Sequence, residues 1–181
     1  MAGEGSTSEK LNHTLFTFIK ILRDNNINDW FVAYGTLLGI VREKSCIEND
    51  DDIDIIINKK YRDKIKELLI KYNFKIDNEG IIKNSNKILK TKTDENYVTI
   101  DFYCAQVNNF GSFYDPWEDV KWSRCYKDKK SKTFEEIEWK GLIVNIPSNF
   151  ETKLEGRYGE NWKIPQNNKG FKKKKNKKFV L

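Results

Sequence analysis

The chain has 181 residues, enough for one domain with its own hydrophobic core. Its net charge of +6 misrepresents the body, because seven lysines and no acidic residue lie within residues 169–181. Removing those seven charges leaves the other residues at −1. A body this close to neutral argues against binding of a long nucleic acid, which calls for a basic surface on the folded part.

Three segments are predicted along the chain. Residues 1–7 form a flexible N-terminus or a cloning remnant, residues 8–168 form a single folded domain, and residues 169–181 form a lysine-rich flexible tail. The tail is a candidate for contact with an anionic membrane. We expect a cytoplasmic protein for three reasons. The three cysteines are widely spaced, no apolar run is long enough to span a membrane, and no signal peptide is recognisable.

Apolar spacing predicts the elements of the first half of the chain. Leucine, isoleucine and phenylalanine recur at helical intervals over residues 8–25, which favours an amphipathic helix. A short strand is expected at residues 30–34, a helix at 37–43, an isoleucine-rich strand at 52–57 and a helix at 59–72. Short strands follow at 74–76, 81–83 and 87–89.

The second half begins with strict alternation over residues 97–104, where Thr99, Asp101 and Tyr103 share the polar face of a strand. A connection rich in tryptophan and lysine leads to a hairpin at residues 136–147. A last helix is expected at 148–159, with Ser148 as its N-cap and Gly159 as its C-terminal stop. This order predicts an α+β fold around one small mixed sheet flanked by helices.

Carboxylates are concentrated where the isoleucine-rich strand begins. Because residues i and i+2 of a strand face the same side, Asp52 and Asp54 project together. Two carboxylates at that spacing can bridge a pair of hard cations about 3.5–4 Å apart, as in phosphoryl-transfer sites. Asp101, on the polar face of the later strand, is the expected third carboxylate. The sequence therefore predicts a site for Mg²⁺ or Mn²⁺.

Two other interpretations of these aspartates were weighed. Asp50, Asp52 and Asp54 match the start of an EF-hand loop, but Ile55 and Tyr61 stand where that loop needs glycine and glutamate, which excludes it. A solvated turn before a strand is the structural alternative. A solvated turn does not explain why an aspartate stands at position 54, beyond Ile53.

A phosphate site is expected upstream of the aspartates. Gly35 and Thr36 lie where a strand turns into a helix, which presents backbone N–H groups, a hydroxyl and the positive end of a helix dipole to an anion. Arg42 is expected to reach the same phosphates bidentately. The Gly-Thr turn is followed 16 residues later by Asp-x-Asp, and a third aspartate lies on a later strand. This layout is typical of the nucleotidyltransferase superfamily (polymerase-beta-like) fold.

The chain resembles the LicD/fukutin family of phosphotransferases. The stretch "YGTLLGIVREKSCIENDDDIDI" is similar to that family's main signature, and "TIDFY" and "WKGLIVNIPSNFETKLEGRYGENWKIP" are similar to its later ones. The likeness covers residues 10–166. The family often carries a Pro-Trp pair just before the aspartates, where this chain has Glu48-Asn49.

The resemblance implies a metal-dependent transferase that moves a phospho-alcohol, such as phosphocholine or ribitol phosphate, from a CDP-linked donor to a sugar hydroxyl of a glycan and releases CMP. On this analogy Asp52, Asp54 and Asp101 hold Mg²⁺ or Mn²⁺, and Asp101 also serves as general base. Gly35, Thr36 and Arg42 would hold the diphosphate.

Two other functions remain open from the sequence. The first is a nucleotidyltransferase that moves NMP from an NTP to a small molecule, an RNA end or a protein. The second is a non-catalytic binding module. Tyr158 and Trp162 are candidates to line a substrate pocket, with Arg157 as a further stacking residue and core packing of the aromatic rings as the alternative. Lys90, just before the strand of Asp101, is interpreted as a solvated lysine.

Overall fold

The computed structural model describes residues 5–77, 86–165 and 179–181. Its main sheet is mixed and follows the order β1-β2-β4-β5-β6-β9, with β3 also paired to β4. The strands are β1 (Trp30–Val32), β2 (Asp52–Asn58), β3 (Ile88–Lys90), β4 (Thr99–Val107), β5 (Phe113–Asp115), β6 (Val120–Trp122) and β9 (Phe179–Val180). The strands β7 (Glu135–Trp139) and β8 (Leu142–Ile146) form a separate hairpin.

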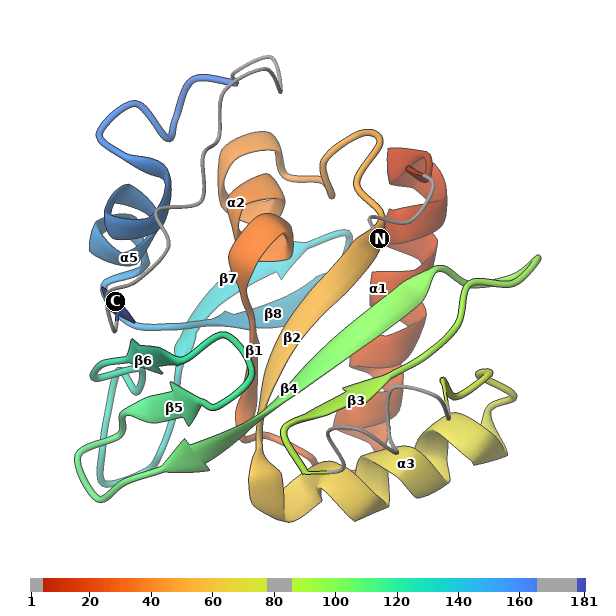
Figure 1. Cartoon of the computed structure of the whole chain (residues 1–181), viewed down its shortest axis with the longest axis horizontal. Coiled ribbons are helices and arrows are strands. Elements are labelled where there is room, and N and C mark those ends of the chain that lie inside the picture. The colour runs from red at the N-terminus through yellow and green to blue at the C-terminus, as the bar shows by residue number, and fades with distance from the viewer. Residues whose placement is uncertain (1–4, 78–85, 166–178) are drawn as a thin grey trace.

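The helices surround this sheet, as Figure 1 shows. They are α1 (Ser8–Asp24), α2 (Tyr34–Glu43), α3 (Arg62–Lys71), which follows a 3-10 turn (Lys59–Tyr61), and α5 (Phe150–Tyr158). The predicted α+β class, with a small mixed sheet and flanking helices, is confirmed. Among the described helices, none has the length and apolar character needed to cross a membrane.

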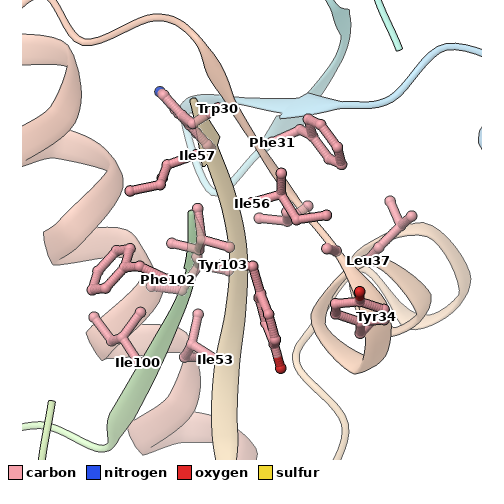
Figure 2. Close-up of a cluster of buried hydrophobic side chains, with 14 of the residues drawn as sticks. Trp30, Phe31, Tyr34, Leu37, Ile53, Ile56, Ile57, Ile100, Phe102 and Tyr103 are labelled. Atoms are coloured by element: carbon pink, nitrogen blue, oxygen red, sulfur yellow. The ribbon is translucent and has the colours of Figure 1, made fainter. Parts of the chain in front are cut away.

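The parallel pair of β2 and β4 forms the centre of the sheet and is covered on both faces. Figure 2 shows Ile53 on the same side as Ile100, whereas Ile56 and Tyr103 project toward α2. All of these side chains are buried. Because alternate residues of β2 face opposite layers, the isoleucines fix the strand between α1 and α2 and direct Asp52 and Asp54 toward α2.

Several predicted boundaries differ from the structure. The strand predicted at 30–34 ends at Val32, and α2 begins at Tyr34, because the Leu37 N–H already donates to the Ala33 carbonyl at 2.8 Å. Residues 74–76 form only an isolated bridge, and residues 81–83 lie outside the described residues. Ser148 is not the N-cap of α5: its hydroxyl bonds Glu135, and residue 149 takes the cap position.

The connection after β4 contains two strands, β5 and β6, that were not predicted. The chain's last described residues join them. Phe179 pairs with Val120, and the Ser123 N–H donates to the Leu181 carbonyl at 2.6 Å. The predicted flexible tail lies mostly outside the described residues, and within it residues 179–181 are bonded to β6 and the loop after it. The first described residues are likewise bonded, since the Ser6 N–H donates to the Asp50 carbonyl.

Candidate active site

The site is centred on two buried aspartates on adjacent strands. Asp54 of β2 lies directly opposite Asp101 of β4 in the parallel register. Neighbouring strands run about 4.8 Å apart, so the two carboxylates emerge side by side from the same face of the sheet. Both are almost fully buried, with 6% and 3% of their surface exposed. Two adjacent carboxylates at this depth repel each other unless a positive charge lies between them.

Asp54 is held by the first turn of α2. The Gly35 N–H donates to Asp54 Oδ2 at 3.0 Å, and the Tyr103 hydroxyl donates to Asp54 Oδ1 at 2.9 Å. The Asp54 N–H in turn donates to the buried Thr36 hydroxyl at 2.8 Å. The amide and hydroxyl expected to hold phosphate thus contact the Asp54 residue itself. Their role toward a donor diphosphate stays a prediction.

One carboxylate oxygen of Asp101 is paired with a cation, and the other has no hydrogen-bond partner among the described residues. Lys90 Nζ of β3 lies 2.7 Å from Asp101 Oδ2, so Lys90 is an ion-pair partner and not a solvated lysine. Asp101 Oδ1 is buried and has no hydrogen-bond partner among the described residues. A buried carboxylate oxygen without a donor is costly and is the kind of atom that a bound cation or a substrate proton satisfies.

A second acidic group borders this pair. Ligand oxygens of Asp50, Asp51 and Asp52 all lie within 4.8 Å of one another, and all three residues are half-buried. Among the described residues this trio meets that spacing, and the set of Asp52, Asp54 and Asp101 stays a prediction. The chain approaches α2 closely here, because a Cβ added at Gly35 would lie only 2.7 Å from Asp50 Oδ2.

Burial and mutual repulsion raise the pKa of the central carboxyls. Burial is the main cause for Asp52, followed by the charges of Asp54 and Asp101. Burial and then the charge of Asp101 raise the pKa of Asp54, against the hydrogen bond from Tyr103. Burial also raises the pKa of Asp101, while Lys90 opposes the shift. A positive charge beside these carboxylates would oppose the rise in their pKa values, as Lys90 already does at Asp101.

These residues fit a hard divalent cation. The donor set consists of carboxylates, which Mg²⁺ and Mn²⁺ prefer, and Asp101 Oδ1 is a buried acceptor without a donor. Asp52 and Asp54 come from one strand, and Asp101 comes from its neighbour. The carboxylates of this part of the chain could therefore hold a metal ion.

The other residues predicted for the site do not all lie beside the aspartates. Arg42 lies in the last turn of α2, about 10 Å along the helix axis from Gly35, and it contacts Glu43 and the Trp162 carbonyl. It makes no contact with the aspartates in the described part of the chain. Trp162 is buried, which favours the core-packing interpretation. Tyr158 ends α5 close enough to Asp54 for that charge to raise its pKa, after burial.

One residue that contacts Asp54, Tyr103, was not predicted from the sequence, and Arg157, weighed there with Tyr158 and Trp162 as a stacking residue, makes a contact that was not predicted. Tyr103 donates to Asp54, and the signal for it was its position on the same strand face as Asp101. Arg157 stacks over the Tyr34 ring at 4.2 Å and lies 3.7 Å from Glu118. Nothing local in the sequence indicates that contact, because α5 and α2 are far apart along the chain.

The fold is similar to that of a nucleotidyltransferase. A crystal structure titled lincosamide antibiotic adenylyltransferase LnuA, lincomycin-bound, is similar in fold, with a TM-score of 0.54 and 16% identity over 83% of this chain and 85% of that one. No curated protein matches the sequence.

The family model described as LicD/FKTN/FKRP, nucleotidyltransferase domain, matches residues 27–149, more than half of the chain. The chain belongs to this family, and the resemblance stated from its motifs is confirmed. The match contains the Gly-Thr turn and the three predicted metal-binding aspartates. Residues 150–165, the later part of the expected C-terminal signature, lie outside it.

Proposed function

We propose that the protein is a metal-dependent transferase that moves a phospho-alcohol from a CDP-linked donor to a sugar hydroxyl of a glycan and releases CMP. Family membership and the fold support a transferase. The observation that carries the proposal is the pairing of Asp54 with Asp101 in adjacent parallel strands, where Asp101 Oδ1 has no described partner.

The residues of the chain suit the steps of this reaction. Asp101 Oδ1 accepts the proton of the acceptor hydroxyl, while Lys90 holds Oδ2 and keeps the carboxylate ionised. The acceptor oxygen then forms a bond to the donor phosphorus, and the bond from phosphorus to the CMP oxygen breaks. Asp52 and Asp54 would hold Mg²⁺ or Mn²⁺, which supplies positive charge to the diphosphate when bound.

The second candidate is transfer of a nucleoside monophosphate from an NTP. The structural likeness to an adenylyltransferase favours it, since the same carboxylates would serve both reactions. The two differ in the bond that is broken and in the released product. The first reaction yields CMP, and the second yields pyrophosphate.

The experiment that distinguishes the two reactions measures CMP and pyrophosphate by chromatography. The protein is incubated with Mg²⁺, a panel of sugar acceptors and either CDP-choline, CDP-ribitol, CDP-glycerol or each NTP. The proposal predicts CMP from at least one CDP-linked donor and none from the Asp52→Asn/Asp54→Asn variant. Pyrophosphate from an NTP, with no CMP from any CDP-linked compound, would replace it with the second candidate.

A further inference from the structure

A basic groove lies away from the aspartates, between β6, the loop after β4 and the start of α5. It encloses about 780 Å³. Its lining includes four cationic side chains and no acidic side chain: Lys121, Arg124, Lys129 and Lys153. Leu181 also lines it, and its main-chain oxygen accepts hydrogen bonds from the Ser123 N–H and hydroxyl. In a body whose overall charge is near neutral, four cations in one hollow mark a local positive potential.

Lys153 is the unusual member of this groove. It lies on α5 and only 3% of its surface is exposed, yet no described residue accepts a hydrogen bond or forms an ion pair with its ammonium. Burial lowers the pKa of Lys153, and the nearby Cys125 thiol acts against that shift only when it is ionised. Burial raises the pKa of Cys125 to about 12, so that thiol is neutral at physiological pH and supplies no counter-charge.

The Lys153 side chain is largely buried, and its Nζ keeps only part of its hydration through the groove. An anion in the groove would supply the opposite charge that no described residue provides. The other three cations of the groove, Lys121, Arg124 and Lys129, are exposed at its rim. They cannot satisfy Lys153, since they carry the same sign.

The start of α5 adds two features that favour an anion. Asn149 lines the groove at the N-cap position but makes no side-chain capping bond, so the first N–H groups of this nine-residue helix lack that partner. Thr152 adds a hydroxyl to the lining. Phe110 also lines the groove and is 69% exposed, and its ring centroid lies 5.5 Å from Lys129 Nζ, which provides an apolar surface beside the charges.

We propose that this groove binds the phosphate or diphosphate group of a phosphorylated small molecule, with Lys153 as its central contact. The exposed ring of Phe110 would lie against the organic part of that molecule. None of the aspartates lines this groove, and Lys153 lies about 7.5 Å along the axis of α5 from Tyr158, the residue that borders Asp54. The proposal does not rest on the transferase reaction.

The test uses the full chain in EDTA, because without a divalent cation the aspartates repel anions. Isothermal titration with inorganic pyrophosphate and with inorganic phosphate should show one site per chain whose affinity falls as salt rises. Lys153→Met should weaken pyrophosphate binding about 10- to 100-fold, the range expected for hydrogen bonds to a charged group. Lys20→Met, which removes an exposed lysine of α1, should leave it unchanged.

Melting temperatures separate a lost site from a lost fold. Without ligand, Lys153→Met should melt at the same temperature as the unaltered chain or higher, because it removes a cation on a largely buried side chain that no described residue pairs with. Arg124→Gln, at the exposed rim, should weaken binding by a smaller factor. Undiminished pyrophosphate binding in Lys153→Met would overturn the proposal. So would binding that requires Mg²⁺ and is lost in Asp54→Asn, or binding to anionic vesicles or RNA without any to pyrophosphate.

Discussion

Lys90 Nζ lies 2.7 Å from Asp101 Oδ2, and this ion pair leaves the other Asp101 oxygen as a buried acceptor without a described partner. Lys90 therefore positions Asp101 and opposes the rise in its pKa. Lys90→Met should raise the pKa of Asp101. Because Asp101 must be ionised to act as the general base, the enzyme then becomes active only at higher pH. The acidic limb of the kcat/KM profile should move upward by about one pH unit.

The matched control for that change is Lys92→Met. Lys92 lies two residues further along the chain and pairs with Asp77 at 3.6 Å. Its substitution should leave the acidic limb in place. An equal shift in both variants would show that general charge, and not the contact with Asp101, controls the profile.

Asp52→Asn should separate activity from stability. Asp52 is half-buried, and burial and neighbouring aspartates raise its pKa, so its charge opposes folding when no cation is bound. Neutralising it should stabilise the metal-free protein by about 1 kcal/mol. It should also lower transferase activity by about 100-fold or more, since a metal ligand is lost. Urea denaturation and CMP release measure the two effects, and a destabilised variant would contradict this account.

The metal-free protein should become less stable as pH rises. The raised pKa values of Asp52, Asp54 and Asp101 mean that the folded state retains protons above pH 3.8, the ordinary carboxyl value, where the unfolded state has released them. The unfolded state then binds fewer protons, so the free energy of unfolding falls as pH increases through this window. Urea midpoints between pH 5 and 8 in EDTA should show the decline.

Mg²⁺ should remove most of this dependence, because a bound cation favours the ionised carboxylates at every pH in that range. The same urea series with saturating Mg²⁺ is the comparison. Identical slopes with and without Mg²⁺ would indicate that no cation binds among these aspartates.

Two glycines of α2 should respond differently to alanine. A Cβ at Gly39 would lie 2.5 Å from the Ser45 backbone carbonyl, which cannot move without shifting the loop toward Asp50. Gly39→Ala should destabilise the protein by about 2 kcal/mol. At Gly35 the close atom is the Asp50 carboxylate, which can rotate away. Gly35→Ala should therefore retain most of the stability and lose activity, as paired melting and CMP-release measurements can establish.

The positions of the aspartates along β2 and β4 could be predicted, because they depend on local sequence. Alternation places Asp52 and Asp54 on one face of β2 and Asp101 on the polar face of β4, and the structure has both faces as expected. The parallel pairing that sets Asp54 opposite Asp101 is consistent with the motif order. These features depend on periods of two residues, which are visible in a single sequence.

The remainder depends on contacts between distant segments. Lys90 meets Asp101 because β3 pairs with β4, and the sequence gives no register for that pair. The strands β5 and β6 have three residues each, too short for alternation to distinguish them from a loop. Arg42 was assigned to the phosphates from its nearness in sequence, but the rise of α2 carries it to the opposite end of the helix.

The most direct test of the central claim is a thermal-shift panel with Mg²⁺ and CDP-choline, CDP-ribitol, CDP-glycerol, CMP, CTP, ATP, GTP and UTP. A ligand at 100 times its dissociation constant adds about 2.7 kcal/mol of stability, which gives a clear shift. The account predicts stabilisation by CMP and a CDP-linked compound that requires Mg²⁺ and disappears in Asp52→Asn/Asp54→Asn. Stabilisation by a purine triphosphate alone, or an equal shift in that variant, would contradict it.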